Sequence, residues 1–149
     1  MDGRAHDAST LLLATTGFLL LRPYQPDGAL AFALASLAGG LFLSPDLDLD
    51  YSRPSRRWSL LRFLWAPYRA LHEHRGRSHT YLYGPLSRLA YLALLGTAVW
   101  WGAGQLVPIE VPPPAKEWAE RTWPFLLAGY LASQWLHLLM DGIRPFAKR

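Results

Sequence analysis

The sequence predicts an all-α fold, a small helical membrane bundle of about four apolar helices plus one interfacial amphipathic helix. Four apolar runs alternate with polar segments rich in proline, glycine and arginine. With 149 residues, the chain is long enough for a single helical domain over residues 1–149 and too short for a second core. Hydrophobic residues make up 51% of the chain and include seven tryptophans, which is rich for a soluble protein, whereas the mean hydropathy of +0.06 is low for a membrane protein.

The apolar runs cover residues 10–21, 28–44, 82–107 and 122–140. A bilayer span requires about 20 apolar residues, with about 17 as a practical minimum, so the last two runs are long enough to cross. The second run is marginal and the first is short, and these two alternatively form a tilted or half-inserted hairpin. A cleaved signal peptide is a further alternative for the first run, but the leader MDGRAHD carries little positive charge and no clear cleavage site follows.

An arginine-rich segment separates the second and third runs. Residues 53–77 contain seven of the fifteen basic residues, interleaved with tryptophan, leucine and phenylalanine. This mixture predicts an amphipathic stretch over residues 58–71 in the headgroup layer of an anionic membrane. The net charge of +4 would also suit nucleic acid, but the interleaved apolar residues favour lipid as the partner, and we expect no nucleic-acid binding.

The distribution of basic residues predicts the orientation if all four runs cross. Eleven basic residues then lie on the side that holds both termini and residues 45–81, and three lie on the opposite side. Cytoplasmic loops are enriched in lysine and arginine. We therefore expect a multi-pass protein of the inner (cytoplasmic) membrane with its basic side in the cytoplasm. A soluble helical bundle is the alternative, because buried helices are equally apolar.

Histidines and aspartates gather at the ends of the apolar runs, all on the basic side in this topology. Because cysteine is absent, any metal must be held by nitrogen and oxygen donors. Imidazole and carboxylate are ligands of zinc, iron and manganese. We predict a site for one or two divalent ions, with zinc favoured over iron or manganese. The predicted ligands are His6, Asp46, Asp48, His74, His79, His137 and Asp141.

The segment SPDLDLD supplies the carboxylates. Pro45 ends the preceding helix, and alternation places Asp46, Asp48 and Asp50 on one side if the backbone is extended. Grouped carboxylates repel one another, so a cation or an arginine must balance them. A solvated acidic turn is the alternative interpretation of this segment.

The segment HEHRGRSHT supplies two imidazoles. Gly76 allows a turn that could point His74 and His79 inward. His72 lies near the end of the amphipathic stretch, where a histidine favours a helix terminus as readily as a metal. Ordinary loop histidines are the alternative here.

The segment HLLMDG closes the last apolar run. His137 and Asp141 are four residues apart and therefore share one helix face. Gly142 fits a helix end, so the pair could equally be a capping feature.

Taken in chain order, these segments resemble a known family. The chain looks like the uncharacterised metal-binding membrane proteins of bacteria and is similar, more distantly, to inner-membrane metal-dependent hydrolases. Those relatives combine an early histidine, a PDxD segment, an HRGxxH segment and a late HxxxD. The resemblance implies metal binding more strongly than catalysis. Asp50 and His72 lie outside the shared motifs, which implies a supporting role around the ligands.

If the protein is an enzyme, its donors suit two ions that share a carboxylate and activate water. We then expect a hydrolase acting on a phosphoester or lipid-type substrate at the cytoplasmic face, with Arg75, Arg77 or Arg88 stabilising negative charge on the substrate. The competing class is a non-catalytic membrane protein with a structural or sensing ion. The sequence contains no glycine-rich phosphate loop, HExxH helix or GxSxG elbow, and Ser78 beside His79 does not by itself make a triad.

Overall fold

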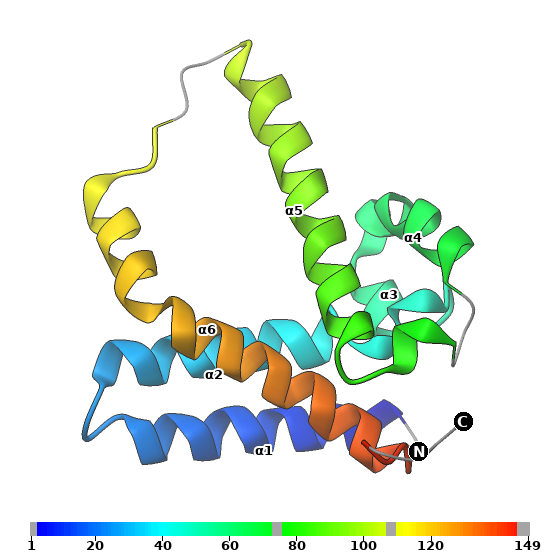
Figure 1. Cartoon of the computed structure of the whole chain (residues 1–149), viewed down its shortest axis with the longest axis horizontal. Helices are drawn as coiled ribbons and strands as arrows, with labels where there is room; N and C mark the ends of the chain where they lie inside the picture. Colours follow the sequence, from blue (N-terminus) through cyan, green and yellow to red (C-terminus); the bar gives the residue numbers. More distant parts are fainter. Residues whose placement is uncertain (1–2, 73–75, 107–109, 146–149) are drawn as a thin grey trace.

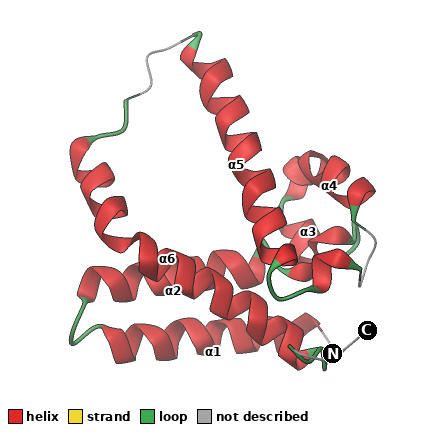
Figure 2. Ribbon diagram, viewed as in Figure 1, coloured by secondary structure: helices red, strands yellow, loops and turns green. Residues whose placement is uncertain are grey.

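The computed structural model describes residues 3–72, 76–106 and 110–145, and within these ranges every regular element is a helix (Figures 1 and 2). The all-α prediction is therefore confirmed. The long helices, which contain most of each predicted apolar run, are α1 (Gly3–Leu21), α2 (Pro26–Leu41), α5 (Tyr83–Gly104) and α6 (Pro113–Met140).

Short helical segments fill the chain between α2 and α5. They are η1 (Pro45–Asp48), α3 (Arg53–Arg57), η2 (Ser59–Trp65), α4 (Ala66–Leu71) and η3 (Arg77–His79). A single amphipathic helix over residues 58–71 was the expectation, and the structure divides this stretch into η2 and α4. Pro67 explains the break, because proline lacks an amide hydrogen and is accommodated in the first turn of α4 rather than inside a longer helix.

Three of the long helices form a packed layer. Helices α1 and α2 are antiparallel neighbours, and the C-terminal half of α6 crosses α2 (Figure 1). The backbones of α2 and α6 are in direct contact, since a Cβ atom on Gly129 would lie 2.3 Å from the carbonyl oxygen of Phe32. Ser36 Oγ also donates to the carbonyl oxygen of Gly129 (3.2 Å). Only glycine permits this approach.

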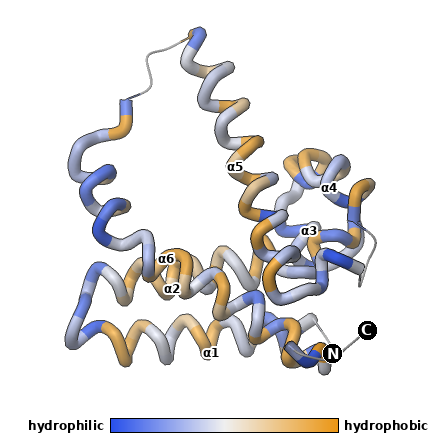
Figure 3. Tube along the Cα trace, viewed as in Figure 1, coloured by the Kyte–Doolittle hydropathy of each residue, from blue (hydrophilic) through white to orange (hydrophobic). Residues whose placement is uncertain are grey.

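Helix α5 and the N-terminal half of α6 extend away from this layer. Helix α6 changes direction near Pro124, and α5 diverges from it (Figure 1). The hydropathy trace is hydrophilic over the N-terminal half of α6 and more apolar beyond the bend (Figure 3). Large apolar side chains on α5, including Leu94, Val99 and Trp101, are exposed. The expected four-helix bundle is thus a three-helix layer with one outlying long helix.

Among the described helices, the segment Pro26–Asp48 is long and apolar enough to cross a bilayer. About half of its most apolar part is buried inside the protein, as in the core helix of a soluble protein. By length and composition, the segment that contains α2 and η1 is therefore a candidate membrane span, and the four-span topology stays a prediction.

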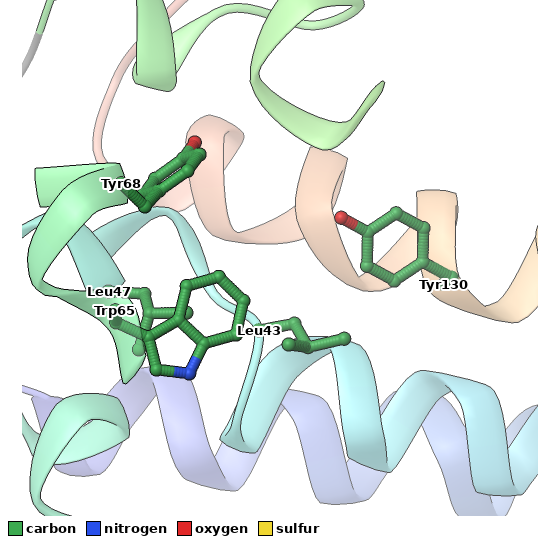
Figure 4. Packing of buried hydrophobic residues seen from close by; sticks show 5 residues of the cluster. All are labelled: Leu43, Leu47, Trp65, Tyr68 and Tyr130. Carbon is green, nitrogen blue, oxygen red and sulfur yellow. The ribbon is translucent and has the colours of Figure 1, made fainter. Parts of the chain in front are cut away.

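A small aromatic core fixes the short helices to the layer. Its buried members are Leu43, Leu47, Trp65, Tyr68 and Tyr130. Figure 4 shows Trp65, Tyr68 and Leu47 on the side of the short helices, facing Leu43 and the Tyr130 ring on α6. This packing holds residues 45–71 over one end of α2 and α6.

Side chains at the end of α3 also donate hydrogen bonds to the last carbonyl oxygens of α2. Arg57 Nη1 donates to the carbonyl oxygen of Leu41 (2.9 Å), and Trp58 Nε1 donates to that of Phe42 (3.0 Å). The last carbonyl groups of a helix have no partner within it, so these bonds satisfy them. Arg57 Nη2 reaches Asp7 on α1 (2.7 Å), which ties α3 to both helices.

We expect Leu47→Ala to lower the free energy of unfolding by about 2–5 kcal/mol, because Leu47 is fully buried and its truncation leaves a cavity. Leu60→Ala is the matched control, since Leu60 is 88% exposed, and its effect should stay within about 0.5 kcal/mol. Equilibrium denaturation of the purified variants measures both values. Equal losses in the two variants would contradict the aromatic core.

Candidate metal centre

Four of the predicted ligands meet at one end of the three-helix layer. Asp46 comes from η1, His79 from η3, His137 from the last turn of α6, and Asp141 from the position directly after α6. One ligand atom from each lies within 4.8 Å of the others. The predicted convergence of distant segments is thus present in the structure for these four residues.

The distances within this group fit ligands of one ion better than hydrogen bonds. Nε2 of His137 lies 3.6 Å from Asp46 Oδ1 and 3.4 Å from Asp141 Oδ2, and Nε2 of His79 lies 3.6 Å from Asp46 Oδ1. A hydrogen bond at such a length is weak or absent. Two ligands on a tetrahedral ion with bonds of about 2.0–2.1 Å lie about 3.4 Å apart.

Burial supports the same conclusion. His79 and His137 are 1% and 5% exposed, so water does not solvate their rings. In the described part of the chain, Nε2 of His137 is buried and makes no hydrogen bond. Leaving a buried polar atom without a strong partner costs free energy, which an ion at the centre of the group would recover. The donor set therefore fits a divalent metal.

His6 lies against this group through Asp141. Its Nε2 is 3.1 Å from Asp141 Oδ1, while the other oxygen of Asp141 faces His137. The His6 ring also stacks on the His137 ring, with centroids 3.9 Å apart. The structure thus places His6, one of the predicted ligands, where it fixes the orientation of both Asp141 and His137.

Asp48 lies behind His79, on the side away from the four-ligand group. Its Oδ2 is 3.4 Å from Nδ1 of His79 and accepts a hydrogen bond from Ser78 Oγ (2.7 Å). Ser78 Oγ lies 3.2 Å from the same Nδ1 and therefore links this ring nitrogen to the Asp48 carboxylate. A hydrogen-bond partner at the second nitrogen of a liganding histidine fixes its tautomer and ring orientation. Asp46 and Asp48 therefore approach His79 from its two ring nitrogens.

The 3-10 turn of η1 produces this arrangement. Ser44 caps the turn by accepting from the amide of Asp46 (3.3 Å), and Pro45 occupies its start. The sequence suggested that an extended backbone would align the three carboxylates, but residues 45–48 form a 3-10 turn instead. Asp50 falls beyond the turn, where it is exposed and pairs with Arg69 (3.0 Å).

A buried arginine holds the His79 segment in place. Arg88 is fully buried and donates to the carbonyl oxygen of Ser78 (3.1 Å) and to Gln134 Oε1 (2.9 Å). Gln134 Nε2 in turn donates to the carbonyl oxygen of Gly39 (2.9 Å). Gly84 permits the close approach, since a Cβ atom there would lie 2.1 Å from the Ser78 carbonyl oxygen. Arg88 was predicted to contact a substrate, but it is buried and instead positions the segment that carries His79.

Sequence reasoning did not identify Gln134 or the supporting role of Ser78. The signal for Gln134 was available, because an uncharged polar residue within an apolar helix normally requires a buried partner. Ser78 carried no comparable signal, because its role depends on the fold that brings η1 beside η3.

The remaining predicted residues lie elsewhere. His72 is buried, with Nδ1 2.9 Å from the Tyr68 carbonyl oxygen and Nε2 3.3 Å from the Tyr83 hydroxyl, and it is not part of the four-ligand group. Arg77 is exposed at the start of η3. His74 and Arg75 lie outside the described residues.

The charges of the site shift the pKa values of its members. Burial lowers the pKa of His79, but the carboxylates of Asp46 and Asp48 outweigh this effect, so the pKa lies above its ordinary value. His137 holds the pKa of Asp141 well below its usual range, although burial opposes the shift. The aspartate is therefore ionised at neutral pH, whereas a proton competes with metal for His79.

We expect His79→Ala to abolish stoichiometric metal binding, because it removes one of four ligands. Asp48→Asn should weaken metal affinity by about 10–100-fold, since it disturbs only the orientation of His79. Elemental analysis and competition with a chelating dye measure these effects. His72→Ala is the matched control, a buried histidine outside the group, and metal loss in that variant would contradict the assignment.

The metal affinity should increase with pH between about pH 6 and 8. The raised pKa of His79 means that its charged form stabilises the metal-free protein at low pH, and this contribution is lost as pH rises through that pKa. The metal-induced rise in melting temperature should therefore grow over the same window. Calorimetric titration at several pH values measures the trend, and a pH-independent affinity would exclude His79 as a ligand.

Comparison with known proteins supports metal binding. Residues 1–149 match the family described as "Uncharacterized metal-binding protein (DUF2227)". The chain is also 35% identical, over 136 residues, to an uncharacterized protein of Aquifex aeolicus (strain VF5), with 83% of this chain and 96% of that protein covered. No solved structure matches the chain. The chain therefore belongs to this family of metal-binding proteins.

Proposed function

We propose that the protein is a metal-dependent hydrolase whose ion is held by Asp46, His79, His137 and Asp141. The observation that carries this proposal is a cavity of about 420 Å³ lined by three of these ligands, Asp46, His137 and Asp141. A purely structural zinc site is normally closed, whereas a catalytic site keeps a position open to water or substrate. Zinc is the favoured ion, with iron or manganese as alternatives.

Residues around the ligands orient them for a metal ion that would activate water. A bound divalent ion lowers the pKa of water and polarises a phosphoryl or acyl oxygen. Asp48 and Ser78 hold the His79 ring, and His6 holds Asp141, so the donors are oriented before metal arrives. The proposed substrate is a phosphoester or a lipid-type molecule that enters through the cavity.

We propose further that the protein lies in the inner membrane with the metal centre at the cytoplasmic face. Exposed leucine and tryptophan side chains on α1 and α5, including Leu12, Leu20 and Trp101, support this placement. Arg4, Arg53, Arg56 and Arg57 line a cavity beside the site, and basic residues are enriched at a cytoplasmic face. Retention in the membrane fraction after an alkaline wash is the expected result, and release would contradict the proposal.

A structural or sensing ion is the second candidate function. One observation favours it: four protein ligands are enough to complete a tetrahedral ion. In that case metal would add its binding free energy to the stability of the folded protein and do nothing else.

Turnover distinguishes the two functions. We expect the metal-loaded protein to hydrolyse a phosphomonoester, a phosphodiester or a phospholipid, and His137→Ala to lose this activity by about a hundredfold or more with its metal. His72→Ala is the control and should keep its rate. Loss of thermal stability on metal removal, with no turnover on any of these substrates by the loaded protein, would support the structural ion and contradict the hydrolase.

A further inference from the structure

We infer that a phosphate group binds beside the metal centre, on the guanidinium groups of Arg53 and Arg56. Both arginines line the same cavity as the ligands Asp46, His137 and Asp141. A second cavity, of about 470 Å³, is lined by Arg4, Arg53, Arg56 and Arg57. The two cavities adjoin, because Arg53 and Arg56 line both. This inference rests on the proposed hydrolase function and names the chemistry that the site recognises.

The second cavity carries a concentration of positive charge. Four guanidinium groups line it, and two of them, those of Arg53 and Arg57, share the carboxylate of Asp7, at 2.9 Å and 2.7 Å. The carboxylates of Asp46 and Asp141 belong to the metal site, where an ion would compensate them. Clustered positive charges repel one another and attract an anion.

The arginines differ in what they already bind. Arg57 is committed to the structure, because it also donates to the end of α2. Arg53 pairs with Asp7, yet its side chain is 42% exposed. Arg56 makes a single hydrogen bond within the described chain, from Nε to the carbonyl oxygen of Tyr51 (3.1 Å). Both Nη groups of Arg56 are therefore available, and this is the pair of donors that a phosphate accepts in bidentate fashion.

Local structure places these arginines together. Ser52 caps α3 by accepting from the amide of Ser55 (3.3 Å), which starts the helical turn at Arg53. Residues 53, 56 and 57 then have the i, i+3 and i+4 spacing that shares one helix face. Asp7 follows His6 directly on α1, so the ion pairs to Asp7 bring this basic face beside the metal site.

The arrangement suits a phosphate ester held between two positive groups. The arginines would take the non-bridging oxygens of a phosphate ester, and the ligands Asp46, His137 and Asp141 line the same cavity. A soluble phosphoester and a phospholipid headgroup share this chemistry. Arg75, Arg77 or Arg88 was the expected contact for the substrate. Arg77 and Arg88 line neither cavity and Arg75 lies outside the described residues, so our inference gives this role to Arg53 and Arg56.

The test is calorimetric titration of the zinc-loaded full-length protein with inorganic phosphate and with glycerol phosphate. We expect Arg56→Gln to weaken binding by about tenfold, the loss expected for a charged hydrogen bond. Arg56→Lys should restore it only in part, because lysine keeps the charge and loses the planar pair of donors. Arg53→Gln should weaken binding as well, with melting temperature as the check on folding.

Arg62→Gln is the matched control, because Arg62 is exposed in η2 and lines neither cavity. Equal phosphate affinity in the wild type, Arg56→Gln and Arg53→Gln would overturn the inference, as would an equal loss in Arg62→Gln. Phosphatidylcholine vesicles with and without phosphatidic acid identify the source of the phosphate. Tighter, arginine-dependent binding to the phosphatidic acid vesicles than to glycerol phosphate assigns a lipid headgroup, and the reverse assigns a soluble ester.

Metal content separates this inference from the proposed function. Elemental analysis should give the same metal content for Arg56→Gln as for the wild type, because Arg56 is not a ligand. If metal binds and hydrolysis occurs but the arginine variants bind phosphate normally, the anion site alone is wrong. If the arginine variants lose phosphate binding but no substrate is hydrolysed, the hydrolase is wrong and the anion site stands.

Discussion

The buried guanidinium group of Arg88 is the contact on which the site depends. It joins the carbonyl oxygen of Ser78 to Gln134 on α6, and Gln134 continues to the backbone of α2 at Gly39. Two further hydrogen bonds, from Tyr130 to the carbonyl oxygen of Pro85 and from Trp135 to that of Tyr81, hold the adjoining residues against α6. Burying this charge is costly, and the hydrogen bonds of its two Nη groups offset part of that cost, so they hold the three segments in one relative position.

The metal centre builds on that position. Asp46 and Asp48 are two residues apart on a 3-10 turn, and the turn directs one to each nitrogen of His79. His137 and Asp141 come from α6, whose place is fixed by backbone contact with α2 at Gly129. Each ligand therefore stands on an element that is held by something other than the metal, as expected for a site that binds with little reorganisation.

The sequence predicted the long helices well, because apolar runs bounded by proline and glycine are a local property. The four members of the group were among the seven predicted ligands, because imidazole and carboxylate are the metal donors of a chain without cysteine. The sequence did not distinguish ligands from the residues that orient them. Asp48 and His6 have the same side-chain types as Asp46 and His137, and only tertiary contacts give them a different role. Arg53 and Arg56 were interpreted as part of a headgroup-facing surface, since composition does not reveal which face of a short helix lines a cavity.

The contact between His6 and Asp141 joins residues 135 positions apart in the chain. During synthesis, His6 therefore cannot contact Asp141 until nearly all of the described chain has been made. His137 and Asp141 arrive last, so an ion cannot be held by the full donor set until that point. Binding of the ion by all four ligands therefore requires that the chain has been made and folded through Asp141. A nascent or truncated chain without His137 and Asp141 would lack two of the four ligands.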